Sequence, residues 1–81
     1  MTGRKFARAF GATLCLVRQE RGVSQERFQA LCGINRTYVS LMERGKRQPT
    51  IHMLMRLAHS LNVEAQWLIT ETLRRLREGQ P

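Results

Sequence analysis

The sequence predicts an all-α protein that consists of five helices in one compact domain spanning residues 1–81. Apolar residues recur at helical spacing along the chain, whereas the apolar–polar alternation typical of strands is never sustained over four residues. Separate domains normally need roughly 100 to 200 residues each, so a chain of 81 residues is expected to build a single core. Four helix stops divide it: Gly22, Gly33, Gly45 and Asn62.

An apolar stripe and a capping residue mark the first two helices. We expect the first helix from about Arg4 to Arg21, with one stripe formed by Phe6, Phe10, Leu14 and Val17. Gly11 lies within it, at a cost of roughly 1 kcal/mol relative to alanine. Ser24 is a good N-cap for a second helix from Gln25 to Cys32, in which Phe28 and Leu31 are expected to face inward.

Three more helices follow. Asn35 caps a third helix that begins at Arg36 and stops at Gly45, and Ile34 is placed to pack on Val39 as a hydrophobic staple. Thr50 caps a fourth helix with an apolar stripe of Ile51, Leu54, Leu57, Ala58 and Leu61. A fifth helix begins near Glu64 and carries Trp67, Leu68, Ile69, Leu73 and Leu76.

The charge distribution indicates a polyanionic partner. Fourteen Lys and Arg residues against six Asp and Glu residues give a net charge of +8, which is typical of nucleic-acid-binding proteins. Residues 1–22 hold five positive and one negative charge, residues 24–47 five and two, and residues 48–81 four and three. The first 47 residues are therefore expected to face the nucleic acid.

The sequence lacks the residue patterns that several other classes of function need. Cys15 and Cys32 are 17 positions apart with no histidine nearby, so we expect two reduced, half-buried thiols and neither a metal site nor a disulfide. His52 and His59 are expected on a helix surface. Ser24 is a cap with no catalytic partner, and no apolar run approaches the ~18 residues of a membrane span. We expect a cytoplasmic protein that is not an enzyme and needs no cofactor.

The second and third helices have the spacing of a helix-turn-helix. Two helices of about seven to nine residues joined by the turn CGIN match the DNA-binding motif whose second helix enters the major groove N-terminus first. Asn35, Arg36 and Thr37 stand at that end. An arginine there offers a planar fork that matches the guanine O6 and N7 acceptors.

The chain resembles the Cro and phage-repressor-like helix-turn-helix proteins. The resemblance runs through LVRQERGVSQERF, LCGINRTYVSLMERGKRQPTI and LAHSLNV, which lie within roughly residues 6 to 68. Within this family, NRTYVS followed by ERG is most similar to the controller proteins of bacterial restriction-modification systems, which are small homodimeric autoregulators. It implies a lambda-repressor-like fold and a bacterial or phage, nucleoid-associated transcription regulator, either repressor or activator, that binds double-stranded DNA.

The resemblance also implies roles for individual residues. Base contacts would come from Arg36, Thr37, Ser40 and Leu41. Phosphate contacts would come from Gln25, Asn35, Tyr38, Arg44, Lys46 and Arg47. Arg18 would form a structural ion pair with Glu43. Leu41 departs from a position that is often polar in the family, and could contact a thymine methyl group or nothing.

Several alternatives remain open at the level of single residues. Arg36 could be an ordinary solvated residue, and Tyr38 could pack at the edge of the core instead of donating to a phosphate. Arg18 and Glu43 could both be solvated, in which case their removal should change stability by at most about 1 kcal/mol.

The fifth helix is expected to serve assembly. Leu68 would close the core. Ile69, Leu73 and Leu76, together with Met53, would form a dimer interface. Residues 69–81 would therefore be a C-terminal extension of the domain that serves dimerisation. Two-fold symmetry would place the recognition helices about 34 Å apart, matching a palindromic operator. The helix could instead fold back on its own domain.

Two rival functions belong to other classes. One is an antitoxin-like interaction module whose fifth helix binds a toxin partner while the domain binds its own promoter. The other is a non-specific RNA or membrane binder that uses LRRLREG, which Glu64, Glu71 and Glu78 in the same helix make less favourable. RNA polymerase is a further candidate partner.

Overall fold

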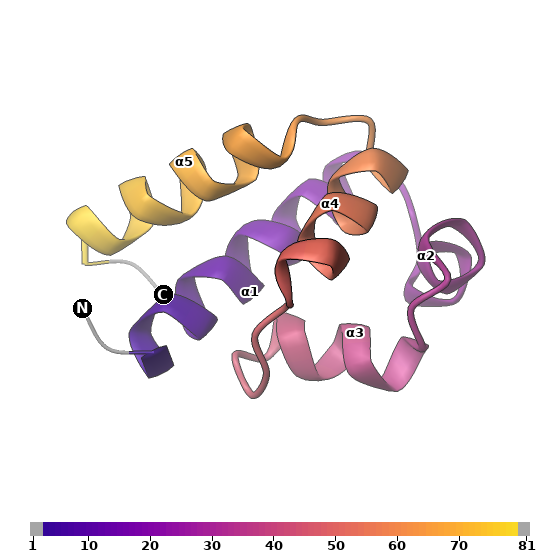
Figure 1. Cartoon of the computed structure of the whole chain (residues 1–81), viewed down its shortest axis with the longest axis horizontal. Coiled ribbons are helices and arrows are strands. Elements are labelled where there is room, and N and C mark those ends of the chain that lie inside the picture. Colours follow the sequence, from indigo (N-terminus) through magenta and orange to yellow (C-terminus); the bar gives the residue numbers. More distant parts are fainter. Residues whose placement is uncertain (1–2, 80–81) are drawn as a thin grey trace.

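The computed structural model describes residues 3–79 and confirms an all-α fold of five helices, with no strand in that range. The helices are α1 (Gly3–Glu20), α2 (Gln25–Cys32), α3 (Arg36–Glu43), α4 (Ile51–Ser60) and α5 (Ala65–Arg77). α1 runs through the molecule, with α5 along one side and the end of α3 against another (Figure 1). α2 packs on α3 and α4, and α4 also contacts α5.

The helix boundaries follow from local chemistry. The side chains of Ser24, Asn35 and Thr50 each accept a backbone N–H from the first turn of the helix that they precede, at 3.0, 2.8 and 3.1 Å. Gly33 ends α2 at φ 73°, and Asn62 follows α4 at φ 58°. These caps and stops are the ones that the sequence predicts, so the elements begin and end within one or two residues of their expected positions.

The core lies between α1 and the other four helices. Its largest fully buried side chains are Phe10, Phe28, Leu14, Met42, Leu57, Leu68, Val39 and Thr72. Ile34 and Val39 both belong to it, as expected of a hydrophobic staple across the start of α3. Leu68 closes the core from α5, as the sequence predicts.

Two expected core residues are exposed, so those expectations are wrong. In α2 the buried positions are Phe28 and Cys32, one helical turn apart, and Leu31 lies well off that arc with 46% of its surface exposed. Ile51 is 78% exposed because it occupies the first turn of α4, where nothing within residues 3–79 covers it.

Gly11 allows α1 and α3 to pack at close range. A Cβ atom at this position would meet the Met42 carbonyl oxygen and would lie 2.8 Å from the Glu43 carbonyl oxygen. Backbone atoms cannot swing aside as a flexible side chain would, so only glycine permits this contact. The residue that weakens α1 as an isolated helix is thus the one that lets the end of α3 dock on it.

Candidate nucleic-acid interface

The residues expected to read bases lie on one face of α3. Arg36 and Thr37 are exposed, and Ser40 and Leu41, one turn further along, are half-buried. Val39 and Met42 point the other way and are completely buried. The helix thus turns an apolar side to the core and a polar side, with only Leu41 apolar, to solvent.

The start of α3 is held against α2. The Arg36 backbone N–H donates to Gln29 Oε1 at 2.5 Å, and Arg36 Nε lies 2.9 Å from Glu26 Oε1. Both side chains of this ion pair are more than half exposed, with 58% for Arg36 and 69% for Glu26, so the pair adds little stability and can open. The backbone of Arg36 is therefore held in place, whereas its guanidinium can exchange Glu26 for another partner.

Asn35 and Tyr38 already have partners within the protein. The Asn35 side-chain oxygen accepts the Thr37 N–H at 2.8 Å, which leaves its amide nitrogen exposed. The Tyr38 hydroxyl donates to the Gln48 carbonyl oxygen at 3.1 Å, and its ring packs at the edge of the core. Tyr38 therefore takes the core-edge position that the sequence left open.

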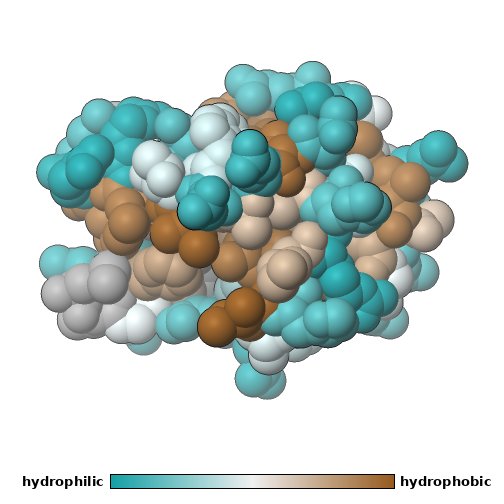
Figure 2. All heavy atoms as spheres, turned by 45° about the horizontal axis from the view of Figure 1, so that its top comes forward, coloured by the Kyte–Doolittle hydropathy of each residue, from teal (hydrophilic) through white to brown (hydrophobic). Residues whose placement is uncertain are grey.

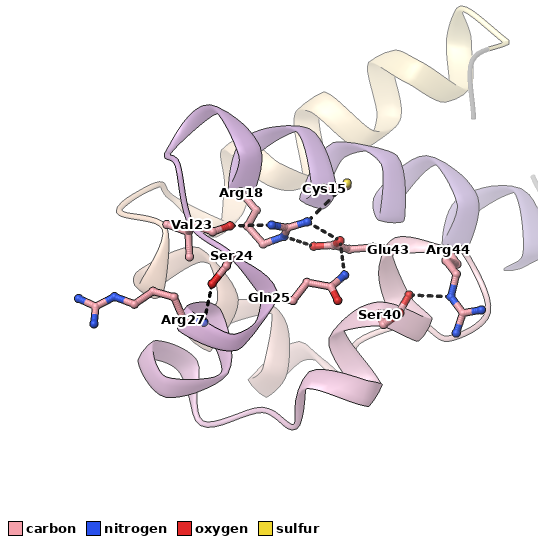
Figure 3. A network of polar contacts seen from close by, with 9 residues as sticks. All are labelled: Cys15, Arg18, Val23, Ser24, Gln25, Arg27, Ser40, Glu43 and Arg44. Carbon is pink, nitrogen blue, oxygen red and sulfur yellow. Dashed lines mark hydrogen bonds and ion pairs between the residues drawn. The ribbon is translucent and has the colours of Figure 1, made fainter.

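A network of polar contacts joins α1, α2 and α3 (Figure 3). Arg18 donates to both carboxylate oxygens of Glu43, at 2.6 and 3.0 Å, and to the Val23 carbonyl oxygen at 2.6 Å. Gln25 Nε2 donates to Glu43 Oε1 at 3.0 Å. The side chains of Arg18 and Glu43 are 11% and 5% exposed, so the structure has a buried, bidentate ion pair.

Two groups in this network have a raised pKa. The hydrogen bond to Glu43 raises the pKa of Arg18 above its ordinary value, so Arg18 keeps its charge. Burial raises the pKa of the Cys15 thiol, and the neighbouring Glu43 carboxylate raises it further. Both cysteines are free; Cys15 is half-buried, whereas Cys32 is more deeply buried than expected.

A basic cleft adds residues that the sequence reasoning did not single out as ligands. The cleft has a volume of about 640 Å³ and lies between the start of α1 and the loop after α3. It is lined by the expected Arg44, Lys46 and Arg47 and also by Arg4 and Arg8. The available signal was the spacing of Arg4 and Arg8, which are one helical turn apart in the most basic third of the sequence.

The expected interface residues of α4 and α5 are only partly covered. Ile69 and Leu73 are 37% and 39% exposed, Leu76 is half-buried, and Met53 packs partly against the core. Figure 2 faces α4 and α5 and shows hydrophobic surface across the middle of this side, bordered by hydrophilic side chains.

Within residues 3–79, no three His, Cys, Asp or Glu side chains are grouped so that they could hold a metal ion. None of the helices in this range is both long enough and apolar enough to cross a bilayer.

The fold and the exposed face of α3 define the class of a helix-turn-helix DNA-binding protein. The model of the helix-turn-helix family HTH_3 matches residues 16–68, and the chain belongs to this family. It is a helix-turn-helix transcriptional regulator, and the family is one of DNA-binding regulators rather than a class of enzymes.

Three comparisons illustrate the relationship. The uncharacterized HTH-type transcriptional regulator y4dJ of Sinorhizobium fredii is 39% identical over 62 residues, which cover 76% of this chain and 80% of the relative. The restriction-modification controller protein C.AhdI of Aeromonas hydrophila has a TM-score of 0.74 at 35% identity, covering 76% of this chain and 94% of that one.

The third is the controller protein C.Esp1396I, solved as a tetramer in complex with its natural 35 base-pair operator. It has a TM-score of 0.72 at 29% identity and covers 84% of this chain and 95% of that chain. The resemblance to phage-repressor-like and controller proteins that the sequence indicated is thereby confirmed.

Proposed function

We propose that the protein is a homodimeric regulator of the restriction-modification controller kind, which binds a palindromic operator with α3 in the major groove. The observation that carries this proposal is the exposed face of α3, which begins at the capped end with Arg36 and Thr37 and continues through Ser40 and Leu41. Similarity to the two controller proteins supports the specific class. Because the ligand is DNA, the protein would act on the nucleoid.

The four residues of this face would divide the work of reading bases. Arg36 would donate two hydrogen bonds to one guanine once Glu26 releases it, which is worth about 1 to 3 kcal/mol of discrimination. Thr37 and Ser40 would add hydroxyl contacts. Leu41, the apolar member, would pack on a thymine methyl group.

The phosphate contacts would surround this face on both sides. Gln25 lies at the start of α2, where free backbone N–H groups favour an anion. Because a carboxylate only accepts hydrogen bonds, the Gln25 amide nitrogen must face Glu43, and its second N–H remains for a phosphate. Asn35 would use its free amide nitrogen, and Arg44, Lys46 and Arg47 their exposed charges. Tyr38 would contact a phosphate only by leaving the Gln48 carbonyl oxygen.

Dimerisation would use the apolar surface of α4 and α5. Ile69, Leu73 and Leu76 follow one another at helical spacing on α5, and Met53 stands on α4, which packs against α5. Residues 69–81 are the proposed dimerisation segment, of which residues 80–81 lie outside the described range. A two-fold axis here would present two copies of α3 to half-sites about 34 Å apart.

Selection of bound sequences from a random duplex pool at physiological salt tests the proposal. We expect a palindromic motif with half-site centres about 10 base pairs apart, or a multiple of that spacing. A gel-shift titration should then show much tighter binding to this duplex than to a scrambled one. Binding without any sequence preference would overturn the role of α3, and co-purification of a second protein chain would instead favour the antitoxin-like function.

A further inference from the structure

Among residues 3–79, the lining of the basic cleft has five positively charged side chains and no carboxylate. Arg4 and Arg8 come from α1, whereas Arg44, Lys46 and Arg47 come from the end of α3 and the loop behind it. The first turn of α1 contains no acidic residue, so no carboxylate of that turn offsets the positive potential of the helix N-terminus beside the cleft. Like charges gathered without a counter-charge repel one another, and an anion in the cleft would relieve that repulsion.

Two contacts fix the start of α1 against the loop after α3. Gln48 Nε2 donates to the Gly3 carbonyl oxygen at 2.8 Å, across 45 positions of sequence. Gly45, at φ 74°, lies so close to Arg8 that a Cβ atom there would stand 2.8 Å from Arg8 Cγ and 3.0 Å from Arg8 Cα. The two walls of the cleft are therefore held at a set separation before any ligand binds.

The cleft lies at the opposite end of α3 from Arg36. α3 has 8 residues, and at a rise of about 1.5 Å per residue it spans roughly 12 Å. The major groove has about the same width. When the start of α3 reads base edges, its other end and the cleft would therefore lie where a DNA backbone borders the groove. Figure 1 shows this end of α3 and the loop after it beside the start of α1.

We propose that this cleft holds a phosphodiester group of the DNA backbone beside the half-site, with Arg4 and Arg8 contacting it from α1. The inference rests on the proposed DNA-binding function and extends it, because Arg4 and Arg8 precede the segment, residues 16–68, that matches the family. They would enlarge the phosphate-contacting surface of each protomer without reading sequence.

The test combines salt titration with phosphate ethylation interference on the selected operator and on a scrambled duplex. The variants are Arg4→Gln and Arg8→Gln, and the matched control is Arg56→Gln, which removes one exposed positive charge from α4 outside the cleft. We expect each cleft variant to reduce the slope of log K against log salt by about 0.9 on both duplexes. We also expect ethylation of a phosphate flanking the half-site to impair the wild type and no longer to impair Arg8→Gln.

The outcomes separate this inference from the proposed function. If the wild type selects an operator but Arg4→Gln and Arg8→Gln keep its slope and its interference pattern, the cleft proposal is wrong and the operator function stands. If the wild type shows no sequence preference while the cleft variants still lower the slope, the cleft stands and the operator function fails. If the slope fell by the same amount in Arg56→Gln, the effect would come from the loss of net charge alone, and this result would also overturn the cleft proposal.

Discussion

Arg18 and Glu43 form a buried ion pair that joins α1 to the helix-turn-helix. Because both side chains are nearly buried, removing either one strands the other charge in a poorly solvated site. We expect Arg18→Met or Glu43→Gln to lower the free energy of unfolding by about 3 to 5 kcal/mol, measured by urea denaturation.

The double variant Arg18→Met/Glu43→Gln is the control for this pair. It leaves no unpaired charge, so it should be more stable than the sum of the two single changes predicts. Single variants that each lose less than about 1 kcal/mol would mean that the pair behaves as a solvated one.

Arg36 and Lys46 should affect DNA binding in different ways. Arg36→Ala removes a base-reading fork, so it should relax specificity at one base pair by about 1 to 3 kcal/mol. Lys46→Ala removes a phosphate contact, so it should weaken operator and scrambled duplexes alike and reduce the salt slope by about 1. Gel-shift titration against operators changed at single positions distinguishes the two, and equal losses on both duplexes for both variants would contradict the division.

The Cys15 thiol should make the free energy of unfolding fall at alkaline pH. Burial and Glu43 raise the pKa of its thiol in the folded protein, so the folded state binds this proton more tightly than the unfolded state. The resulting stabilisation is complete below the unfolded pKa of about 8.5 and is lost as the pH rises through the folded pKa.

The stability of the wild type should therefore fall more than that of Cys15→Ser, which has no thiol to titrate, between pH 7 and pH 10. Thermal unfolding of both proteins across this range measures the difference. Parallel curves would show that Cys15 titrates equally in both states.

At the scale of elements, the docking of α3 on α1 depends on Gly11. Gly11→Ala should favour an isolated helix by about 1 kcal/mol, yet in this fold its Cβ would meet the Met42 and Glu43 carbonyl oxygens. We expect a net loss of about 1 to 3 kcal/mol in unfolding free energy, since backbone must shift to make room.

The neighbouring change Ala12→Gly provides the comparison for Gly11→Ala. It removes a Cβ atom from the same helix, so it should lower stability by only about 1 kcal/mol through helix propensity. A Gly11→Ala protein as stable as the wild type would show that α3 can move away from α1 without loss.

The helix boundaries were predictable because each depends on a few adjacent residues. Ser24, Asn35 and Thr50 form their caps with atoms two or three residues away, which the sequence displays directly. Leu31 and Ile51 were misplaced because apolar spacing identifies a helix face but not whether another element covers it. That Arg4 and Arg8 line the basic cleft was missed for the same reason, since the residues opposite them lie about 40 positions away in the sequence.

For the molecule as a whole, the apolar surface of α5 is the proposed site of assembly. Leu73→Lys places a charge on a side chain that is 39% exposed in one protomer, so we expect the fold to persist and the dimer to dissociate. Analytical ultracentrifugation should show monomers, and binding to the full operator should weaken more than binding to one half-site.

Met55→Lys is the matched control for Leu73→Lys. Met55 is 59% exposed on α4 and is not part of the proposed interface, so this variant should remain dimeric. If Leu73→Lys sedimented like the wild type, the interface would have to lie elsewhere on the molecule.

The five helices, their caps, the turn between α2 and α3, and the basic character of the first 47 residues could all be read from the sequence, because each is a property of neighbouring residues. The packing of the helices was needed to learn which apolar residues are covered, how Arg18 and Gln25 share Glu43, and that α1 supplies a wall of the basic cleft. Those features join residues 18 to 45 positions apart, so they depend on how the helices pack, which spacing along one chain does not encode.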